Sequence, residues 1–572
     1  MSAKWDFKKG LRAHVPRKGA RFAEIHEICR KAAKIKANGA NDGAGGPPLH
    51  VDEDKNSYAM QLDMHGVIVG DTGSKKTRLI MAPTIINLCH AGESMVINDS
   101  KGELLKMTKP LMDKLGYTVY IVNLRRPETG SRWNPLGIAY DDYQEGKVSK
   151  SDEVLRDLAE VLYKTQKPGA NDPFWRNSAV SYFVGLAQLL RGECSKEEFH
   201  LEGLDYLNTT GKMRFASSSY LKEYFSVFEN KNAETNLEDT LSTANDTRAG
   251  IVSSYKEPMP IFAAQENICD MMCRSDFDVL DLARKKTAIF LVVPDEKTTY
   301  NFITVTFIMQ CYQRLIEAAH LIFDGTLPRR VNIILDEFGN LPAIKDVGPM
   351  LSASRSRNIR FFIAIQSTAQ LRIAYGETAE TVMTNCGVWY YLKTKDMNLL
   401  NELSTRCGTV IGEYDGRERP LLSVSQLQRL NKDDGEVLIL QQGEYPFITR
   451  LPDVSEYGVE MGVSLKEMQK REKVERKLYD IRPLVKEAKK AKLMKDIPAT
   501  TADHRFINLF EDDEEAPLEE KLKDVERELD MAQKKAEARA RALIEKDLRR
   551  KAEAKKKDEK AKRDAEADEE AS

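Results

Sequence analysis

The stretch from residue 65 to residue 81, HGVIVGDTGSKKTRLIM, constrains the fold more than any other part of the chain. A short apolar run at residues 67–69 suits a buried strand, and an apolar helical pattern begins near Leu79. The loop between them is built of small and polar residues and ends in Lys76 and Thr77. Strand, loop, Lys-Thr and helix in this order are the layout of a phosphate-binding loop, whose backbone N–H groups face the phosphates.

In such a loop the lysine reaches the terminal phosphate and the threonine hydroxyl holds magnesium. One residue departs from the pattern, because Lys75 stands where glycine usually precedes that lysine. A lysine there costs about 1–2 kcal/mol if the position needs an unusual dihedral. Taken alone, the loop could also be an ordinary strand-to-helix turn with exposed lysines. We predict that ATP with Mg2+ is bound by the whole loop: Gly70, Asp71, Thr72, Gly73, Ser74, Lys75, Lys76 and Thr77.

Length and composition indicate a large intracellular protein with several domains. The 572 residues are too many for one hydrophobic core. A formal net charge of −2 gives no overall attraction for nucleic acid, so any DNA contact must be a local patch. The eight cysteines lack zinc-binding spacing, which indicates reduced thiols. We find no signal peptide and no apolar run of about 18 residues, so we expect a cytoplasmic protein, or one held at the inner face of the cell membrane by a partner.

The strand and helix patterns alternate around the loop. Apolar runs at residues 94–99 and 117–123 predict two more strands, with helical spacing at 104–115 between them. This order predicts a parallel α/β sheet that binds ligands at the carboxyl ends of its strands. From 141 to 274 the strand pattern disappears, which predicts an all-helical insertion, and the sheet resumes at 287–293.

Two later strands carry the remaining candidate catalytic residues. The apolar run at 331–335 ends in Asp336, which would orient magnesium, and Glu337, which would polarise the attacking water. The run at 359–365 ends in Gln366, which would sense the γ-phosphate. Arg355 lies at the end of the intervening helix and could supply a positive charge to a neighbouring subunit's nucleotide, although a solvated helix end is an equal alternative.

From about residue 21 to residue 454 the chain resembles the type IV coupling proteins, the ring-forming ATPases of conjugation and type IV secretion. The order and spacing of many segments carry this resemblance better than any one segment does. They are GDTGSKKTR at 70–78, NDSKGEL at 98–104, RWNPL at 132–136, DPFWRNSA at 172–179, SDFDVLDLARKKTAIFLVVPDE at 275–296, LDEFGNLPAI at 335–344, LSASRSRNIRFFIAIQSTAQL at 351–371 and RPLLSVSQLQRLNKDDGEVLILQQGEYP at 419–446.

The resemblance implies a RecA-like P-loop NTPase domain and a helical domain at the cytosolic mouth of a ring, where relaxase and DNA are received. It also implies a role for each matching residue. Lys76 would bind phosphate, Thr77 and Asp336 would hold magnesium, and Glu337 would act on the attacking water. Gln366 would be the sensor, and Arg355 would act in trans on a neighbouring subunit. Family members usually begin with transmembrane helices, and this chain shows none. We therefore expect attachment through secretion-channel proteins or a separate membrane anchor, or no attachment to the membrane.

We expect four parts in the chain: a basic N-terminal arm and linker at 1–57, with a helix at 20–35; a RecA-like domain at 58–140 and 275–455; the all-helical insertion at 141–274; and a charged helical, coiled-coil or disordered tail at 456–572. The tail contains a short heptad seam. Its members are Leu518, Leu522, Val525, Leu529, Ala532 and Ala536.

The expected function is an ATP-driven DNA-transfer motor, a homo-hexamer that couples a relaxase-bound single strand to a conjugative secretion channel. Two alternatives remain open. The chain could be a nucleotide-binding receptor or scaffold with weak hydrolysis, because Lys75 crowds the loop. It could also be a cytosolic double-strand DNA translocase with no role in secretion.

Overall fold

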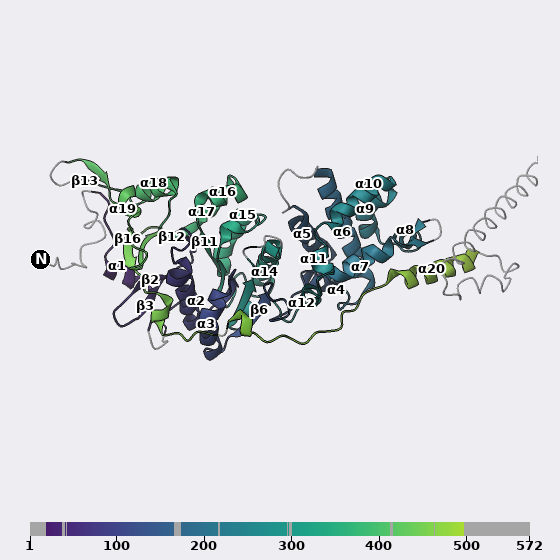
Figure 1. Cartoon of the computed structure of the whole chain (residues 1–572), viewed down its shortest axis with the longest axis horizontal. Coiled ribbons are helices and arrows are strands. Elements are labelled where there is room, and N and C mark those ends of the chain that lie inside the picture. The colour runs from purple at the N-terminus through teal and green to yellow at the C-terminus, as the bar shows by residue number, and fades with distance from the viewer. Residues whose placement is uncertain are drawn as a thin grey trace, which may run out of the picture. The chain divides into compact units, whose positions relative to one another are not determined.

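The computed structural model describes residues 19–36, 41, 43–164, 173–215, 218–294, 296, 300–411, 416–462 and 464–496. The chain divides into two compact units. Figure 1 labels the helices and strands of the chain. The first contains residues up to Asp205 together with Thr235–Tyr479, and the second contains Tyr206–Glu234 and the chain from Asp480 onward. The predicted heptad seam at 518–536 lies outside the described residues. Among the residues described, no helix is both long enough and apolar enough to cross a membrane.

A nine-stranded sheet in the order β16-β15-β12-β4-β11-β10-β5-β9-β6 organises the first unit. All neighbours from β12 to β6 are parallel, whereas β15 and β16 are added antiparallel at one edge. The predicted α/β, RecA-like fold is confirmed, since β4 and β10 lie in one sheet with β11 between them. The strands are β4 (His65–Val69), β5 (Ser94–Asn98), β6 (Thr118–Asn123), β9 (Thr287–Val292), β10 (Val331–Leu335), β11 (Ile359–Ile365), β12 (Cys386–Tyr391), β15 (Glu436–Gln441) and β16 (Phe447–Arg450).

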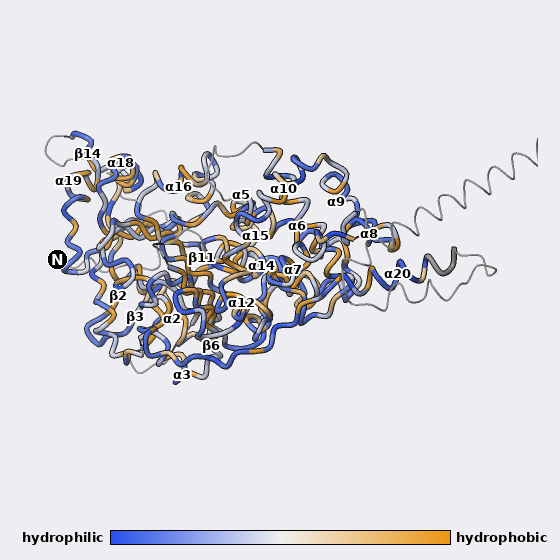
Figure 2. Tube along the Cα trace, turned by 45° about the vertical axis from the view of Figure 1, so that its right-hand side comes forward, coloured by the Kyte–Doolittle hydropathy of each residue, from blue (hydrophilic) through white to orange (hydrophobic). Residues whose placement is uncertain are grey.

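The central strands are buried along their whole length, because helices cover both faces of a parallel sheet. Every residue of β4, β5, β9, β10 and β11 is buried. Figure 2 shows the hydrophobic positions gathered in this sheet. The phosphate-loop helix begins with a π-helical turn, η2 (Thr77–Met81), and continues as α2 (Ala82–Ala91). The other helices around the sheet are α3 (Glu103–Lys114), α14 (Asn301–Leu321), α15 (Val347–Ser354), α16 (Thr368–Tyr375), α17 (Thr378–Asn385), α18 (Met397–Arg406) and α19 (Val424–Leu427).

The N-terminal segment differs from the prediction of a helix and a linker. Helix α1 (Ile25–Arg30) is short, and residues 33–35 form β1 (Ala33–Ile35) in a sheet of order β1-β3-β2, with β2 (Pro48–Val51) and β3 (Ser57–Ala59). The glycines of the supposed linker allow close packing instead. A Cβ on Gly45 would lie 2.7 Å from the Asn87 carbonyl oxygen, and one on Gly46 would lie 2.0 Å from that of Met60.

The segment predicted as all-helical is helical in the residues described, except for one pair of two-residue strands, β7 (Arg214–Phe215) and β8 (Ser218–Ser219). The two compact units divide this segment at other points than the predicted domain limits, so the four-part division stays a prediction. Its helices are α4 (Gly137–Gln144), α5 (Val148–Lys164), α6 (Pro173–Glu193), α7 (Leu201–Gly211), α8 (Tyr220–Phe225), α9 (Lys231–Ser242), α10 (Asn245–Lys256), α11 (Pro260–Ala263) and α12 (Glu266–Met272), followed by α13 (Asp281–Arg284). In the second unit α8 packs against α20 (Ile481–Asp496), where Lys489 pairs with Glu223.

His65, the first residue of β4, links the phosphate-loop strand to its neighbours. Its ring is fully buried, Nδ1 accepts the Phe361 N–H at 3.0 Å, and Nε2 donates to the Leu351 carbonyl at 2.7 Å. Burial lowers the pKa of this histidine from 6.5 to about 4, since a buried imidazolium would be poorly solvated.

We predict that this histidine makes stability depend on pH. Between pH 6.5 and 4 the unfolded chain binds a proton at His65 and the folded chain does not, so the free energy of unfolding falls as the pH falls. The shift corresponds to about 3 kcal/mol lost by pH 4. Unfolding of the wild type and of His65→Gln, followed from pH 7 to pH 4, measures the effect. The variant should be less stable at pH 7 and show a shallower slope, and equal slopes would contradict the prediction.

Candidate functional site

The predicted site residues meet at the carboxyl edge of three adjacent strands. Val69 is paired with Ile365 and Leu335 with Ile363, so β4, β11 and β10 end side by side. The Gly70 N–H donates to the Ile365 carbonyl at 3.2 Å, which fixes the start of the loop against β11. The phosphate loop, Gln366 and the Asp-Glu pair therefore lie together, as expected for ligands of a parallel sheet.

A chain of hydrogen bonds joins the loop to the candidate catalytic carboxylate. The Thr72 hydroxyl donates to Gln366 Oε1 at 3.2 Å, and Gln366 Nε2 donates to Glu337 Oε2 at 2.8 Å. Glu337 has a left-handed backbone with φ of 58°, which is unusual for a side chain of this kind and marks a constrained position. Gln366 is thus the bridge between the loop and Glu337, and its predicted role as a sensor of the γ-phosphate stays a prediction.

Lys76 is buried inside the loop. Its ammonium donates to the Gly70 carbonyl at 2.5 Å and to the Asp71 carbonyl at 3.4 Å. Burial lowers its pKa, while the charges of Glu337 and Asp336 act in the opposite direction. The charges of both carboxylates thus act on the lysine, and the loop's own carbonyls accept its hydrogen bonds.

Asp336 is nine-tenths buried, and its environment suits a cation. Burial raises its pKa to about 7, and the neighbouring charges of Glu337 and Asp99 add to the effect. A carboxylate in this state gains from a nearby positive charge, and oxygen donors such as Asp336 and the Thr77 hydroxyl are those that Mg2+ prefers. The described residues contain no group of three His, Cys, Asp or Glu side chains placed to hold a metal. The donor set fits Mg2+ that is held mainly by phosphate oxygens and water.

Two buried side-chain oxygens at this edge also support a bound ligand. Ser74 Oγ in the loop and Asn98 Oδ1 at the end of β5 are buried and have no hydrogen-bond partner in the described part of the chain. Buried polar atoms usually have partners, so unpaired ones at the edge where phosphates would lie support a polar ligand. The residues present therefore fit a nucleotide with magnesium.

Lys75 occupies a backbone conformation that favours glycine. Its φ is 67°, in the left-handed region that L-residues rarely adopt. Its ammonium extends away from the loop interior and pairs with Asp433 Oδ1 at 3.0 Å. The adjacent Lys432 donates to the Gly73 carbonyl at 3.0 Å. The departure from the loop pattern thus brings backbone strain, while the turn at 432–433, which precedes β15, contacts the loop through an ion pair and a hydrogen bond.

Arg355 lies away from the other predicted site residues. It begins the 3-10 turn η5 (Arg355–Arg357) at the amino end of β11, whereas Gln366 follows the carboxyl end of the same strand. The exposed Arg355 donates through Nε to the Asp63 carbonyl at 2.9 Å. The structure does not bring this arginine to the other predicted residues of the same chain.

Three polar residues at the end of β5 and after it had no predicted role, although they follow the same sequence pattern as Asp336. Asn98 Nδ2 donates to the Asp336 carbonyl at 2.9 Å, and the Asp99 carboxylate accepts the Leu105 N–H at 2.8 Å. The charges of Lys76 and Lys101 act to lower the pKa of Asp336, against the effect of burial. All three could have been identified from the sequence, because polar residues at the carboxyl end of a buried strand lie at the edge of the sheet where ligands bind.

Comparison with known proteins decides the family. The family model described as type IV secretory system conjugative DNA transfer matches residues 22–439 of this chain. The chain belongs to this family.

Individual relatives of the conjugative DNA-transfer family are distant. The protein VirD4 of Rhizobium rhizogenes is 24% identical over 422 residues, which are 68% of this chain and 58% of the relative. The chain thus matches less than two thirds of that relative's length. The plasmid coupling protein TrwB in complex with the ATP analogue ADPNP superposes with a TM-score of 0.51 at 15% identity, over 76% of this chain and 93% of that one. TrwB in complex with ADP and Mg2+ gives a TM-score of 0.51 at 14% identity, over 79% and 95%. At this identity the two structures show a shared fold.

We predict that Lys75→Gly tightens nucleotide binding by at most about five-fold, because glycine adopts a positive φ without the strain of about 1 kcal/mol, and loss of the ion pair with Asp433 offsets part of this gain. Titration of the purified protein with a fluorescent ATP analogue, with Mg2+ present, measures the change. Asp433→Asn is the matched control, since it removes the ion pair and leaves the backbone strain in place. Weaker binding in Lys75→Gly with a smaller salt dependence would instead show a direct contact of Lys75 with phosphate.

Proposed function

We propose that this chain is an ATP-driven motor that transfers DNA, coupling a relaxase-bound single strand to a type IV secretion channel. One observation carries the proposal: hydrogen bonds link the phosphate loop through Gln366 to Glu337. A protein that only binds nucleotide needs the loop, but it does not need a carboxylate held beside a sensor of the terminal phosphate.

Each residue has a distinct task in this mechanism. The loop's backbone N–H groups and Lys76 hold the phosphates, and Thr77 and Asp336 would hold Mg2+, which neutralises phosphate charge when bound. Glu337 accepts a proton from the attacking water. Gln366 orients Glu337 before hydrolysis, and its bonds to Thr72 and Glu337 rearrange when the terminal phosphate leaves.

The partners follow from family membership and from the position of Arg355. Family membership supports DNA, relaxase and secretion-channel proteins as partners. An exposed arginine at the opposite edge of the sheet has no task in its own site, which supports action on a neighbour's nucleotide in a homo-hexameric ring.

The strain at Lys75 favours a second candidate, a nucleotide-binding receptor that recruits cargo with little hydrolysis. In such a receptor nucleotide would set ring assembly alone. ATP turnover in the purified protein discriminates between the two candidates.

We predict that the wild type hydrolyses ATP and that DNA stimulates the reaction. Glu337→Gln should bind nucleotide normally and lose turnover by about 10²–10⁴-fold, because a general base is removed. Lys76→Ala should lose binding as well, since it removes the buried cation of the loop. Rates with and without single-stranded DNA, together with analogue binding, check each variant. Turnover absent from the wild type, or unchanged in both variants, would favour the receptor.

A mixing experiment tests the task of Arg355. Arg355→Ala and Glu337→Gln should each be inactive alone, and a mixture of the two should regain turnover, because some interfaces combine an intact arginine with an intact carboxylate. Arg357→Ala is the matched control on the same turn. A mixture that stays inactive, or an active Arg355→Ala protein, would contradict action in trans.

A further inference from the structure

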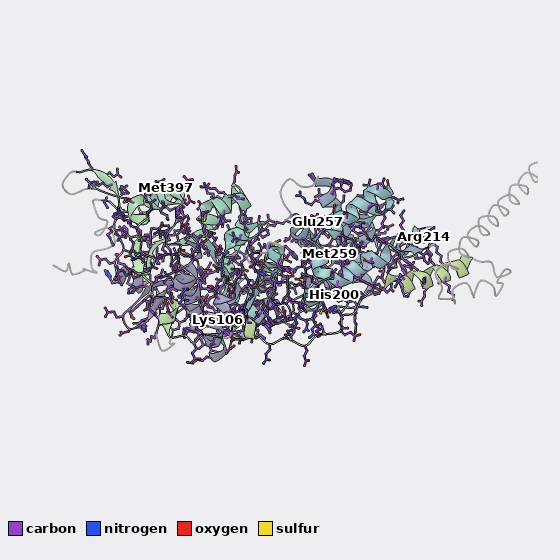
Figure 3. All side chains as sticks on the ribbon, in the orientation of Figure 1. Lys106, His200, Arg214, Glu257, Met259 and Met397 are labelled. Atoms are coloured by element: carbon purple, nitrogen blue, oxygen red, sulfur yellow. The ribbon has the colours of Figure 1, made fainter. Side chains whose placement is uncertain are left out.

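The chain that follows the large sheet, Gly462 together with residues 464–477, is called here the C-terminal strap. It runs extended except for the 3-10 turn η7 (Leu465–Glu467) and contacts three separate parts of the first unit. Figure 1 shows its course from α3 toward the helical segment. Lys106 and His200, both labelled in Figure 3, mark the first and the last of these parts.

The first contact is with α3, at a carbonyl that lacks its helical donor and at a glycine that precedes the helix. Pro110 lies inside the helix and has no N–H, so the Lys106 carbonyl lacks its helical donor. The Gly462 N–H donates to that carbonyl at 2.8 Å. Gly102, with φ of 74°, precedes the helix, and a Cβ there would lie 2.5 Å from Leu465 Cδ1. The strap therefore fits α3 at both places.

This first contact lies next to the candidate site. Gly102 belongs to the same loop as Asn98, which donates to the Asp336 carbonyl, and Asp99, which accepts the Leu105 N–H of α3. The loop also carries Lys101, whose charge acts on Asp336. The strap thus rests on the loop that borders the proposed magnesium residue.

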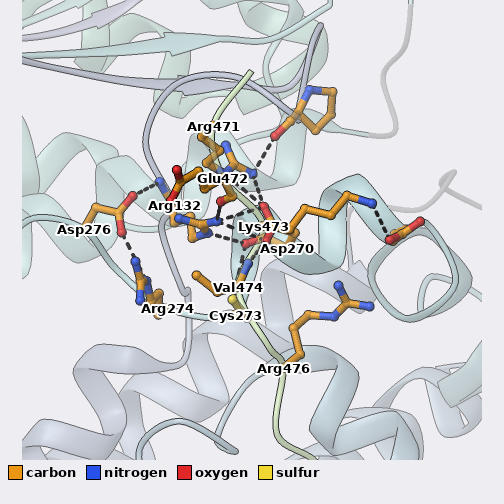
Figure 4. Close-up of polar contacts among 12 residues, drawn as sticks. Arg132, Asp270, Cys273, Arg274, Asp276, Arg471, Glu472, Lys473, Val474 and Arg476 are labelled. Atoms are coloured by element: carbon orange, nitrogen blue, oxygen red, sulfur yellow. Dashed lines mark hydrogen bonds and ion pairs between the residues drawn. The ribbon is translucent and has the colours of Figure 1, made fainter. Parts of the chain in front are cut away.

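The second contact is a buried cluster around Asp270 of α12 (Figure 4). Asp270 accepts Arg471 Nε at 2.9 Å, Arg132 Nη2 at 3.1 Å and the Val474 N–H at 3.2 Å. The side chains of Asp270 and Arg132 are 4% and 5% exposed, and that of Arg471 is 10% exposed. Release of the strap here would break the bonds of Arg471 and Val474 to Asp270 together with the bond from Arg132 to the Glu472 carbonyl, so the strap at this cluster docks or releases as one piece.

Arg471 also binds the loop that follows β6. Its Nη2 donates to the Pro127 carbonyl at 2.6 Å and its Nη1 to the Thr129 carbonyl at 2.9 Å. Lys470 forms a backbone bridge with Thr129. One guanidinium therefore joins the strap, the edge of the sheet and α12.

The third contact is with the start of α7 in the helical segment. Arg476 Nε donates to Glu202 Oε2 at 2.7 Å, and His200 Nε2 lies 3.1 Å from the Lys477 carbonyl. The side chains of Arg476 and Glu202 are about one-fifth exposed, so this pair is partly shielded from solvent. A single stretch of chain thus contacts the loop beside the candidate site at one end and the start of α7 at the other.

We propose that the C-terminal strap couples the nucleotide site to the helical segment, with Arg471 as the residue that positions it. The inference rests on the proposed function. Nucleotide at Asp336 shifts the loop under Leu465, and the strap, which is docked as one piece, passes this shift to Asp270 and Glu202. DNA or cargo bound by the helical segment acts along the same route in reverse, because coupling between two sites is reciprocal.

Hydrogen exchange of the full chain tests the coupling directly. Peptides covering residues 464–477 should change their exchange rate several-fold on addition of ADPNP with Mg2+. In Arg471→Ala the strap should exchange rapidly in both states. Basal ATP turnover should stay within two-fold of wild type, while stimulation by single-stranded DNA should fall at least five-fold. Arg471→Lys, which keeps the charge but loses the guanidinium geometry, should recover part of the stimulation.

Lys473→Ala is the matched control, because Lys473 lies on the same strap and its pair with Glu266 of α12 is at the surface, with both side chains 61% exposed. Leu465→Ala tests the first contact without touching the buried charges and should also reduce stimulation. If wild type binds and hydrolyses ATP with no change in strap exchange, the coupling is wrong and the motor proposal stands. The coupling is also wrong if Arg471→Ala and Leu465→Ala are stimulated like wild type. A wild type that binds no nucleotide overturns both proposals.

Discussion

The parallel pairing of β4, β11 and β10 is the constraint on which the site depends. Because β11 lies between the other two, the side chain that follows it is placed between the phosphate loop and the carboxylates. His65 fixes this register, since its ring accepts the Phe361 N–H from β11. A slip of one residue would turn every side chain to the opposite face, where the closely packed neighbours on each side would no longer fit it. Gly66 adds to the fit, because a Cβ there would lie 2.9 Å from the Phe362 ring.

The sheet and most of the site were predictable from sequence, since both depend on local patterns. Each central strand is an apolar run that ends in polar residues, and the run at 331–335 coincides with β10 (Val331–Leu335). The prediction failed at residues 20–57, where glycines indicated a linker. Their role is to let the carbonyl oxygens of Asn87 and Met60 approach the backbone closely. Close packing of this kind depends on residues distant in sequence, and no local pattern records it.

The contact of Lys75 with Asp433 at the site could not be predicted from sequence either. No sequence pattern joins Lys75 to a residue so far along the chain, and the sheet topology alone explains their contact. β15 runs antiparallel to β12, so the turn that precedes Glu436 lies at the carboxyl edge of its neighbours. The phosphate loop follows β4 at that same edge. Adding two antiparallel strands therefore brings Lys432 and Asp433 to the outside of the loop.

The magnitudes at Lys75 indicate why glycine could be replaced there. A positive φ costs a residue with a side chain about 1 kcal/mol, and an exposed ion pair contributes about 0.2–1 kcal/mol. The pair with Asp433 is exposed, with side chains of Lys75 and Asp433 at 34% and 71% of full exposure. Strain and pairing are therefore of similar size, and the loop keeps its path at small net cost. Because the ion pair is screened by salt and the strain is not, the lysine is best tolerated at low ionic strength. The turn at 432–433 thus compensates for the missing glycine. This compensation depends on ionic strength, whereas the conformational freedom of a glycine would not.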